Sequence, residues 1–134
     1  MNERFVISHL RRLPVFEHVA PEQLPLVASI AQVMRIEPGN LLVTQGQHSD
    51  AMYLFISGRG ILTRRGDDGI EEQVGAVGEG QFIGEETLYS ERIEPYSLRI
   101  VESSIVVMIP KRALAGLITH YPELRANIGM QQAA

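Results

Sequence analysis

The sequence contains no cysteine. It can therefore form no disulfide, zinc–thiolate site or iron–sulfur cluster, and it has no cysteine nucleophile. No apolar run approaches the roughly 18 residues that a membrane-spanning helix needs. The N-terminal segment carries charges throughout and lacks the apolar core of about 7–15 residues that marks a signal peptide. We therefore expect a soluble, cytoplasmic protein that does not enter a membrane.

Basic residues are few and scattered, and the net charge is −4. The sequence thus predicts no nucleic-acid-binding surface on this chain. The four histidines, His9, His18, His48 and His120, show neither an H-x-H nor an H-x-x-x-H spacing, so we expect no metal site. No nucleophile elbow or P-loop is present, so we expect no catalytic residue and no enzyme. A metal-dependent enzyme of the cupin type is the weakest alternative.

The 134 residues, 45% of them hydrophobic, suffice for a single domain over 1–134. Residues 1–33 predict two helices. The first is amphipathic over 3–12, and the second runs from about residue 20 to Val33, with Pro21 and Pro25 near its start. Residues 110–134 predict two more helices, over 111–118 and 123–131.

Between these helices, over 34–109, the apolar period changes from 3.6 to 2. Short β-prone runs alternate there with glycine-rich turns at intervals of about 8–12 residues. The predicted strands include 41–43, 52–56, 60–64, 70–77, 96–101 and 104–109. We expect an α+β, mainly β fold: an antiparallel β-roll or jelly roll of about eight strands, flanked by N-terminal and C-terminal helices.

The largest interruption between strands lies within GEGQFIGEETLYSERIEPYSLR, residues 78–99. Gly84 permits close approach of the backbone, and the residues after it can form a short helix whose first amides point outward. Such amides are suited to hold an anion. Glu85 and Glu86 are also what a helix N-terminus favours without any ligand.

The order of these features resembles the cyclic nucleotide-binding domain family. The matching stretches span nearly the whole chain: LPVF (13–16), PGN (38–40), MYLFISG (52–58), GEGQFIGE (78–85) and YPEL (121–124). The resemblance implies that cAMP or cGMP binds at a cassette over 82–96, with no other cofactor. It implies that Glu85 takes the ribose 2′-hydroxyl and that the following amides cradle the cyclic phosphate. The candidate ligand-binding residues are Phe82, Ile83, Gly84, Glu85, Glu86, Thr87, Leu88, Arg92, Pro95, Tyr96 and Ser97.

The chain departs from the family at the phosphate. Where the family places an arginine after the loop proline, this chain has Tyr96, and Glu86 adds a second negative charge beside the anion site. Losing one partner of a buried arginine–phosphate contact costs roughly 2–5 kcal/mol. Arg92 in the loop is the better candidate to substitute. Arg99 lies at an odd offset from Tyr96 and so points to the opposite face of the strand.

These observations leave two functions open. One is a regulatory, ligand-sensing module that couples occupancy of the pocket to movement of the C-terminal helices. The other is a degenerate member, its pocket closed by Tyr96 and Glu86, that acts in protein interaction or dimerisation. Either one predicts an output domain, fused or separate, or a homodimer.

Overall fold

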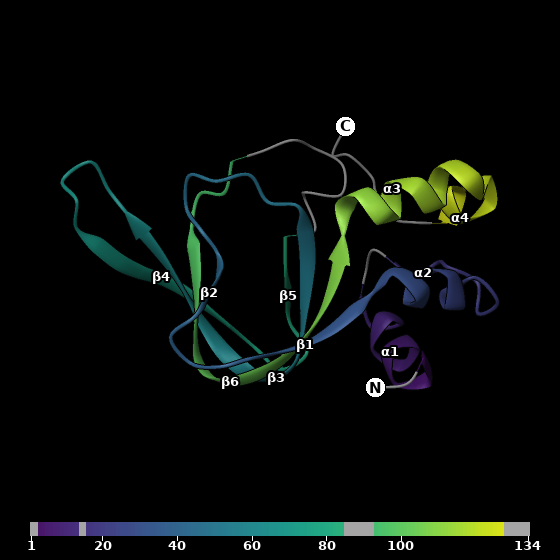
Figure 1. The fold of residues 1–134 in the computed structure, drawn as a ribbon, viewed down its shortest axis with the longest axis horizontal. Coiled ribbons are helices and arrows are strands. Elements are labelled where there is room, and N and C mark those ends of the chain that lie inside the picture. The colour runs from purple at the N-terminus through teal and green to yellow at the C-terminus, as the bar shows by residue number, and fades with distance from the viewer. Residues whose placement is uncertain (1–2, 14–15, 85–92, 128–134) are drawn as a thin grey trace.

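The computed structural model describes residues 3–13, 16–84 and 93–127 (Figure 1). Two helices come first, α1 (Glu3–Leu10) and α2 (Leu24–Ile30). Pro25 occupies the first turn of α2, as predicted. The helix ends before the predicted boundary at Val33, because Ala31 is extended and Val33 instead pairs with Val107 in the sheet. Pairing between distant strands overrides the helical period here.

The strands form an antiparallel sheet that curls into a roll, which confirms the predicted fold class (Figure 1). They are β1 (Gln32–Ile36), β2 (Leu41–Val43), β3 (Ala51–Arg65), β4 (Glu71–Gly78), β5 (Phe82–Ile83) and β6 (Ser97–Pro110). The order is β1-β6-β3-β4, with β2 paired to β6 and β5 paired to β3. Helices α3 (Lys111–His120) and α4 (Pro122–Asn127) follow β6 directly.

Two pairs of predicted strands are continuous in the structure. The sequence predicts a strand end at Ser57 and Gly58, but β3 runs on to Arg65, and β6 likewise continues through its predicted break. The β3–β6 register shifts around Ser57 and again beside Arg59, so the chain bulges there and does not turn. Gly58 has a φ of +93°, and a Cβ placed on it would lie 2.5 Å from the Cα of Ser104. The glycine marks a close strand crossing.

Ser104 secures this crossing from the other strand. Its side chain is fully buried. The Ser104 Oγ accepts a hydrogen bond of 3.1 Å from the Arg59 N–H and donates one of 2.7 Å to the Glu102 carbonyl. The hydroxyl therefore pairs backbone groups that the bulge leaves out of the strand ladder.

The buried apolar side chains form two clusters. The helical cluster joins all four helices to the ends of β3 and β6 and contains Val6, Leu10, Leu13, Phe16, Val19, Leu24, Val27, Met52, Leu54, Val107, Ile109, Leu114 and Leu124. The roll cluster lies inside the curled sheet and contains Val43, Phe55, Val77, Leu98, Ile100 and Val106. The helices gather at one end of the roll, and the β3–β4 hairpin projects at the other (Figure 1). None of the described helices is long and apolar enough to cross a membrane.

Candidate functional site

Strand β5 leads into the predicted cassette and contacts both clusters. Phe82 pairs with Leu54 and packs against the helical cluster, whereas Ile83 pairs with Tyr53 and packs against the roll cluster. Successive side chains of a strand point to opposite faces, which accounts for this division. The first two residues of the candidate site therefore join the inside of the roll to the helices.

Gly84 begins the cassette in a conformation that favours glycine. It is buried, its φ is +89°, and a Cβ there would lie 2.8 Å from the Ala51 carbonyl oxygen. The preceding carbonyl, that of Asp50, accepts a hydrogen bond of 2.8 Å from the backbone N–H of Lys111, the first residue of α3. The start of β3 thus contacts the cassette entrance on one side and the start of α3 on the other.

Two acidic residues, Asp50 and Glu94, lie near Tyr53 at the edge of the roll cluster. Glu94 is a buried carboxylate, 7% exposed, and its backbone pairs with Gly46 and Gln47. Burial of the Tyr53 phenol, with a further contribution from the carboxylates of Asp50 and Glu94, raises the pKa of Tyr53 above its usual value. Both carboxylates therefore lie near the phenol of Tyr53, whose backbone pairs with Ile83 of β5.

We expect Tyr53 to make the stability of the domain depend on alkaline pH. Its pKa is higher in the folded chain than in the unfolded chain. Above about pH 10 the unfolded chain therefore loses a proton that the folded chain keeps, and the free energy of unfolding falls as the pH rises further. Urea unfolding between pH 9 and about pH 11.5 measures this slope. The Tyr53→Phe variant should show a shallower slope, and an unchanged slope would contradict the assignment.

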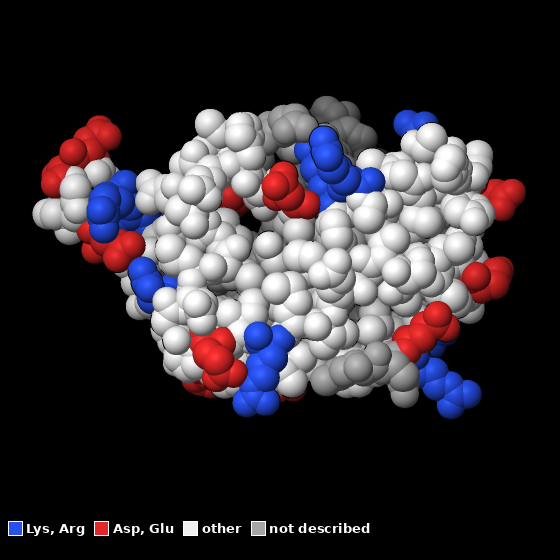
Figure 2. Space-filling model, in the orientation of Figure 1, with Lys and Arg blue, Asp and Glu red and all other residues white. Residues whose placement is uncertain are grey.

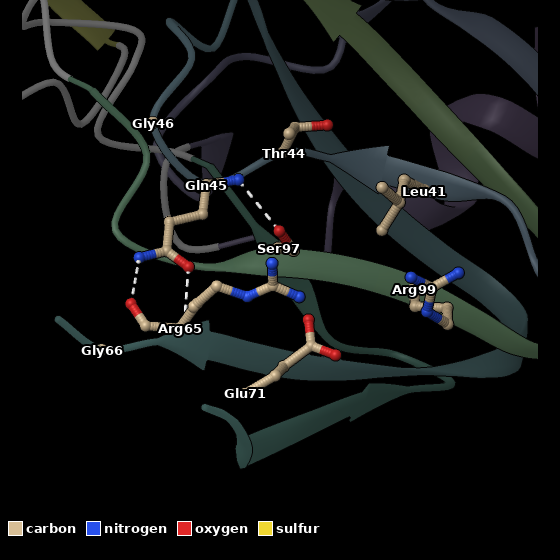
Figure 3. Close-up of a pocket in the computed structure, with 9 residues that line it drawn as sticks. All are labelled: Leu41, Thr44, Gln45, Gly46, Arg65, Gly66, Glu71, Ser97 and Arg99. Carbon is tan, nitrogen blue, oxygen red and sulfur yellow. Dashed lines mark hydrogen bonds between the residues drawn. The ribbon is translucent and has the colours of Figure 1, made fainter. Parts of the chain in front are cut away.

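The end of the candidate site lies at the start of β6. Pro95, Tyr96 and Ser97 are half-buried. The Ser97 Oγ accepts a hydrogen bond of 2.9 Å from the backbone N–H of Gln45, and Ser97 shares a pocket with Arg99 (Figure 3). Leu98 and Ile100, which alternate with them, belong to the roll cluster. Ser97 and Arg99 therefore face away from the roll interior, and the ligand contact predicted for Ser97 stays a prediction.

Five of the predicted site residues lie outside the described residues: Glu85, Glu86, Thr87, Leu88 and Arg92. Their predicted roles at the ribose and phosphate stay predictions. Within the described part of the chain, no three histidine or acidic residues gather in a group that could hold a metal ion.

The family model described as "cyclic nucleotide-binding domain" matches residues 33–121. The chain belongs to the cyclic nucleotide-binding domain family. Among solved structures, the cyclic nucleotide-binding-like protein from Brucella abortus superposes with a TM-score of 0.76 at 26% identity, covering 84% of this chain and 97% of that one. The regulatory subunit of a cAMP-independent protein kinase A from Trypanosoma brucei gives a TM-score of 0.75 at 17% identity, covering 92% of this chain and 46% of that one.

Curated relatives are much longer proteins. Lysophospholipase nte1 from Aspergillus terreus is 25% identical over 126 residues, which is 94% of this chain but 8% of that enzyme. Domains of the cyclic nucleotide-binding family are typically regulatory and non-catalytic. The similarity lies in such a domain, and the enzyme's activity is not carried over to this chain.

Three site features were missed by sequence reasoning. The burial of Glu94 near Tyr53 is visible only in the structure, and the sequence gives only its place before Pro95. The sequence predicts that Tyr53 lies in a strand but indicates no role for it. Its alternation with Met52 and Leu54 puts it on the opposite face of the strand from those two residues. Gly84 itself indicates a close backbone approach, but its neighbour Ala51 follows only from the distant pairing of β5 with β3.

Proposed function

We propose that this cyclic nucleotide-binding domain is a ligand-operated regulatory module. A ligand held in the roll by the cassette displaces α3 and α4, and these helices pass the signal to an output domain or partner. The observation that carries the proposal is the convergence of cassette, strand and helix at Asp50 and Ala51. A ligand acts on such a module only through its different affinities for two conformations.

Two routes support the coupling. In the first, Gly84 lies close to the Ala51 carbonyl, and the carbonyl of the preceding residue, Asp50, accepts a hydrogen bond from the first amide of α3. A shift at the cassette entrance therefore reaches the helix through these two consecutive residues. In the second, Phe82 packs directly against the cluster that holds Leu114 of α3 and Leu124 of α4. Both routes begin within three residues of Glu85, the predicted ribose ligand.

Charge and side-chain placement argue for weak affinity toward cyclic nucleotides. Tyr96 stands where the family has its phosphate arginine, and Glu86 adds a negative charge next to the predicted ribose ligand Glu85. The absent arginine contact corresponds to roughly 2–5 kcal/mol, or about 30- to several-thousand-fold in affinity. We therefore expect the dissociation constants of cAMP and cGMP for this chain to lie far above the micromolar range.

The same observations favour a second candidate, a module that binds no cyclic nucleotide and acts only through its surfaces. The Trypanosoma brucei neighbour is named as cAMP-independent, and its variant described as bound to cAMP replaces a glutamate by alanine, a threonine by arginine and a valine by alanine. That variant loses a glutamate and gains an arginine. In this chain, the changes of the same kind would be Glu86→Ala and Tyr96→Arg.

Calorimetric titration at low salt with cAMP and cGMP, followed by amide hydrogen exchange over residues 111–127, tests the proposal. We expect saturable heat at ligand concentrations well above micromolar and altered exchange in α3 when the site is filled. Saturable binding with unchanged exchange in α3 and α4 would contradict the coupling. If neither nucleotide produces saturable heat, the module that binds no cyclic nucleotide is the correct one.

A further inference from the structure

A pocket lies beside the turn end of the β3–β4 hairpin, where the last residue of β3 and the first residue of β4 lie near the β2–β3 loop and the start of β6 (Figure 3). We call it the hairpin pocket. Its volume is about 570 Å³, and it is lined by Leu41, Thr44, Gln45, Gly46, Arg65, Gly66, Glu71, Ser97 and Arg99. This size falls within the range of roughly 300–1,000 Å³ that is usual for small-molecule sites. Of the described residues that are predicted for the cassette site, Ser97 alone belongs to this lining.

Strand register places the polar side chains of the pocket on one face of the sheet. Arg65 pairs with Glu71 across the hairpin, and Thr63 pairs with Ser97 on the other neighbouring strand. Figure 3 shows the Arg65 side chain extending past Ser97 and Glu71 toward Arg99. The Thr63 hydroxyl donates a hydrogen bond of 3.1 Å to Glu71 Oε2, which holds this carboxylate on the floor of the pocket.

Hydrogen bonds fix the frame of the hairpin pocket. The Gln45 side chain accepts from the Arg65 N–H at 2.8 Å and donates to the Arg65 carbonyl at 3.0 Å, which ties the β2–β3 loop to the hairpin. The Gln45 N–H donates to Ser97 Oγ, which ties the same loop to β6. A pocket whose walls are held in this way loses little conformational entropy when a ligand binds.

The two guanidinium groups keep most of their hydrogen-bonding capacity. Among the described residues neither Arg65 nor Arg99 forms an ion pair, and the one side-chain hydrogen bond of Arg99 goes to the Gly39 carbonyl at 3.0 Å. Each guanidinium carries five N–H donors in a fork that matches a phosphate. The Ser97 hydroxyl accepts from Gln45 and still has its own proton to donate.

Charge in this region is concentrated on the hairpin, where both acidic and basic side chains gather (Figure 2). Within the pocket, two arginines and one glutamate leave a local excess of positive charge on a chain whose net charge is −4. The two guanidinium groups can therefore attract an anion to this pocket. Glu71 in addition offers an acceptor for a donor group next to that anion.

We propose that the hairpin pocket binds a small phosphate monoester that carries a hydroxyl group near its phosphate. Arg65, Arg99 and the Ser97 hydroxyl hold the phosphate, and Glu71 accepts a hydrogen bond from the ligand hydroxyl. The proposal does not rest on the function proposed for the roll, although Ser97 is also one of the residues predicted for the cassette site. A ligand here also contacts three strands and the β2–β3 loop, and it stabilises their arrangement.

The test is a titration of the full chain with ribose 5-phosphate, inorganic phosphate and ribose. It is followed by ¹⁵N NMR of the arginine Nε–H groups and of the Gln45 and Ser97 amides. We expect saturable shifts at these groups, with ribose 5-phosphate binding more tightly than phosphate and ribose producing none. Arg65→Gln and Arg99→Gln should each weaken ribose 5-phosphate binding by about tenfold or more.

Arg64→Gln is the matched control, because Arg64 is exposed on the same strand and points to the other face. It should change the affinity by less than about twofold. Glu71→Ala should raise the affinity for inorganic phosphate. It should also reduce the factor by which ribose 5-phosphate binds more tightly than inorganic phosphate. Equal losses in the Arg64 and Arg65 variants, or no saturable shift at Arg65 and Arg99, would overturn the proposal.

Discussion

Replacing Gly58 with alanine is expected to cost the domain roughly 3–5 kcal/mol, a large part of the usual stability of a small domain. Two effects add. The φ of +93° disfavours any residue with a Cβ, and the new methyl group would lie 2.1 Å from Ser104 Oγ and 2.5 Å from Ser104 Cα. The backbone of β6 cannot move aside without breaking the hydrogen bond that Ser104 Oγ accepts from the Arg59 N–H of β3.

Gly39→Ala separates the two effects. Gly39 has a nearly equal φ of +96°, but a Cβ there would meet nothing within 4 Å. Its replacement should cost only the backbone strain, about 1–3 kcal/mol. Urea unfolding followed by circular dichroism compares the two variants, and this probe suits a chain without tryptophan. If both variants lose the same stability, the crossing at Ser104 is not the tight contact described above.

Tyr96→Arg is expected to strengthen cAMP binding by about 30- to several-thousand-fold, because it restores a bidentate, charge-assisted contact to the cyclic phosphate. The negative charge of Glu86 opposes the anion and places the single variant toward the lower end of this range. Adding Glu86→Ala should increase the gain further. Calorimetry with cAMP measures each affinity.

Tyr96→Gln is the control for the space that the aromatic ring occupies. It removes the ring without adding a charge, so it should leave cAMP affinity within a few-fold of that of the natural chain. A gain in the glutamine variant as large as that in the arginine variant would show that the tyrosine blocks the pocket sterically. The absence of any gain in the arginine variant would mean that residue 96 does not reach the phosphate.

Much of the fold could be predicted from local patterns. The change of apolar period near Met34 separates the helices from the roll, and the prolines and glycines mark most turns. Ser57 and Gly58 were interpreted as a strand end, because the same residues serve a turn and a bulge. Only the neighbouring strand β6 decides between them, since its Ser104 lies against the glycine. The end of α2 was likewise set by the pairing of Val33 with Val107.

By itself, the sequence indicated the family, which the match over residues 33–121 confirms, and it predicts the place of the cassette and the missing arginine, because these depend on residue identity and order. Tertiary structure alone decided that Glu94 is buried near Tyr53, that Asp50 and Ala51 join the cassette entrance to α3, and that Arg65 and Arg99 share a pocket. Each of these contacts joins residues far apart in the chain. Burial, charge and coupling depend on such distances in space, which no local period or motif records.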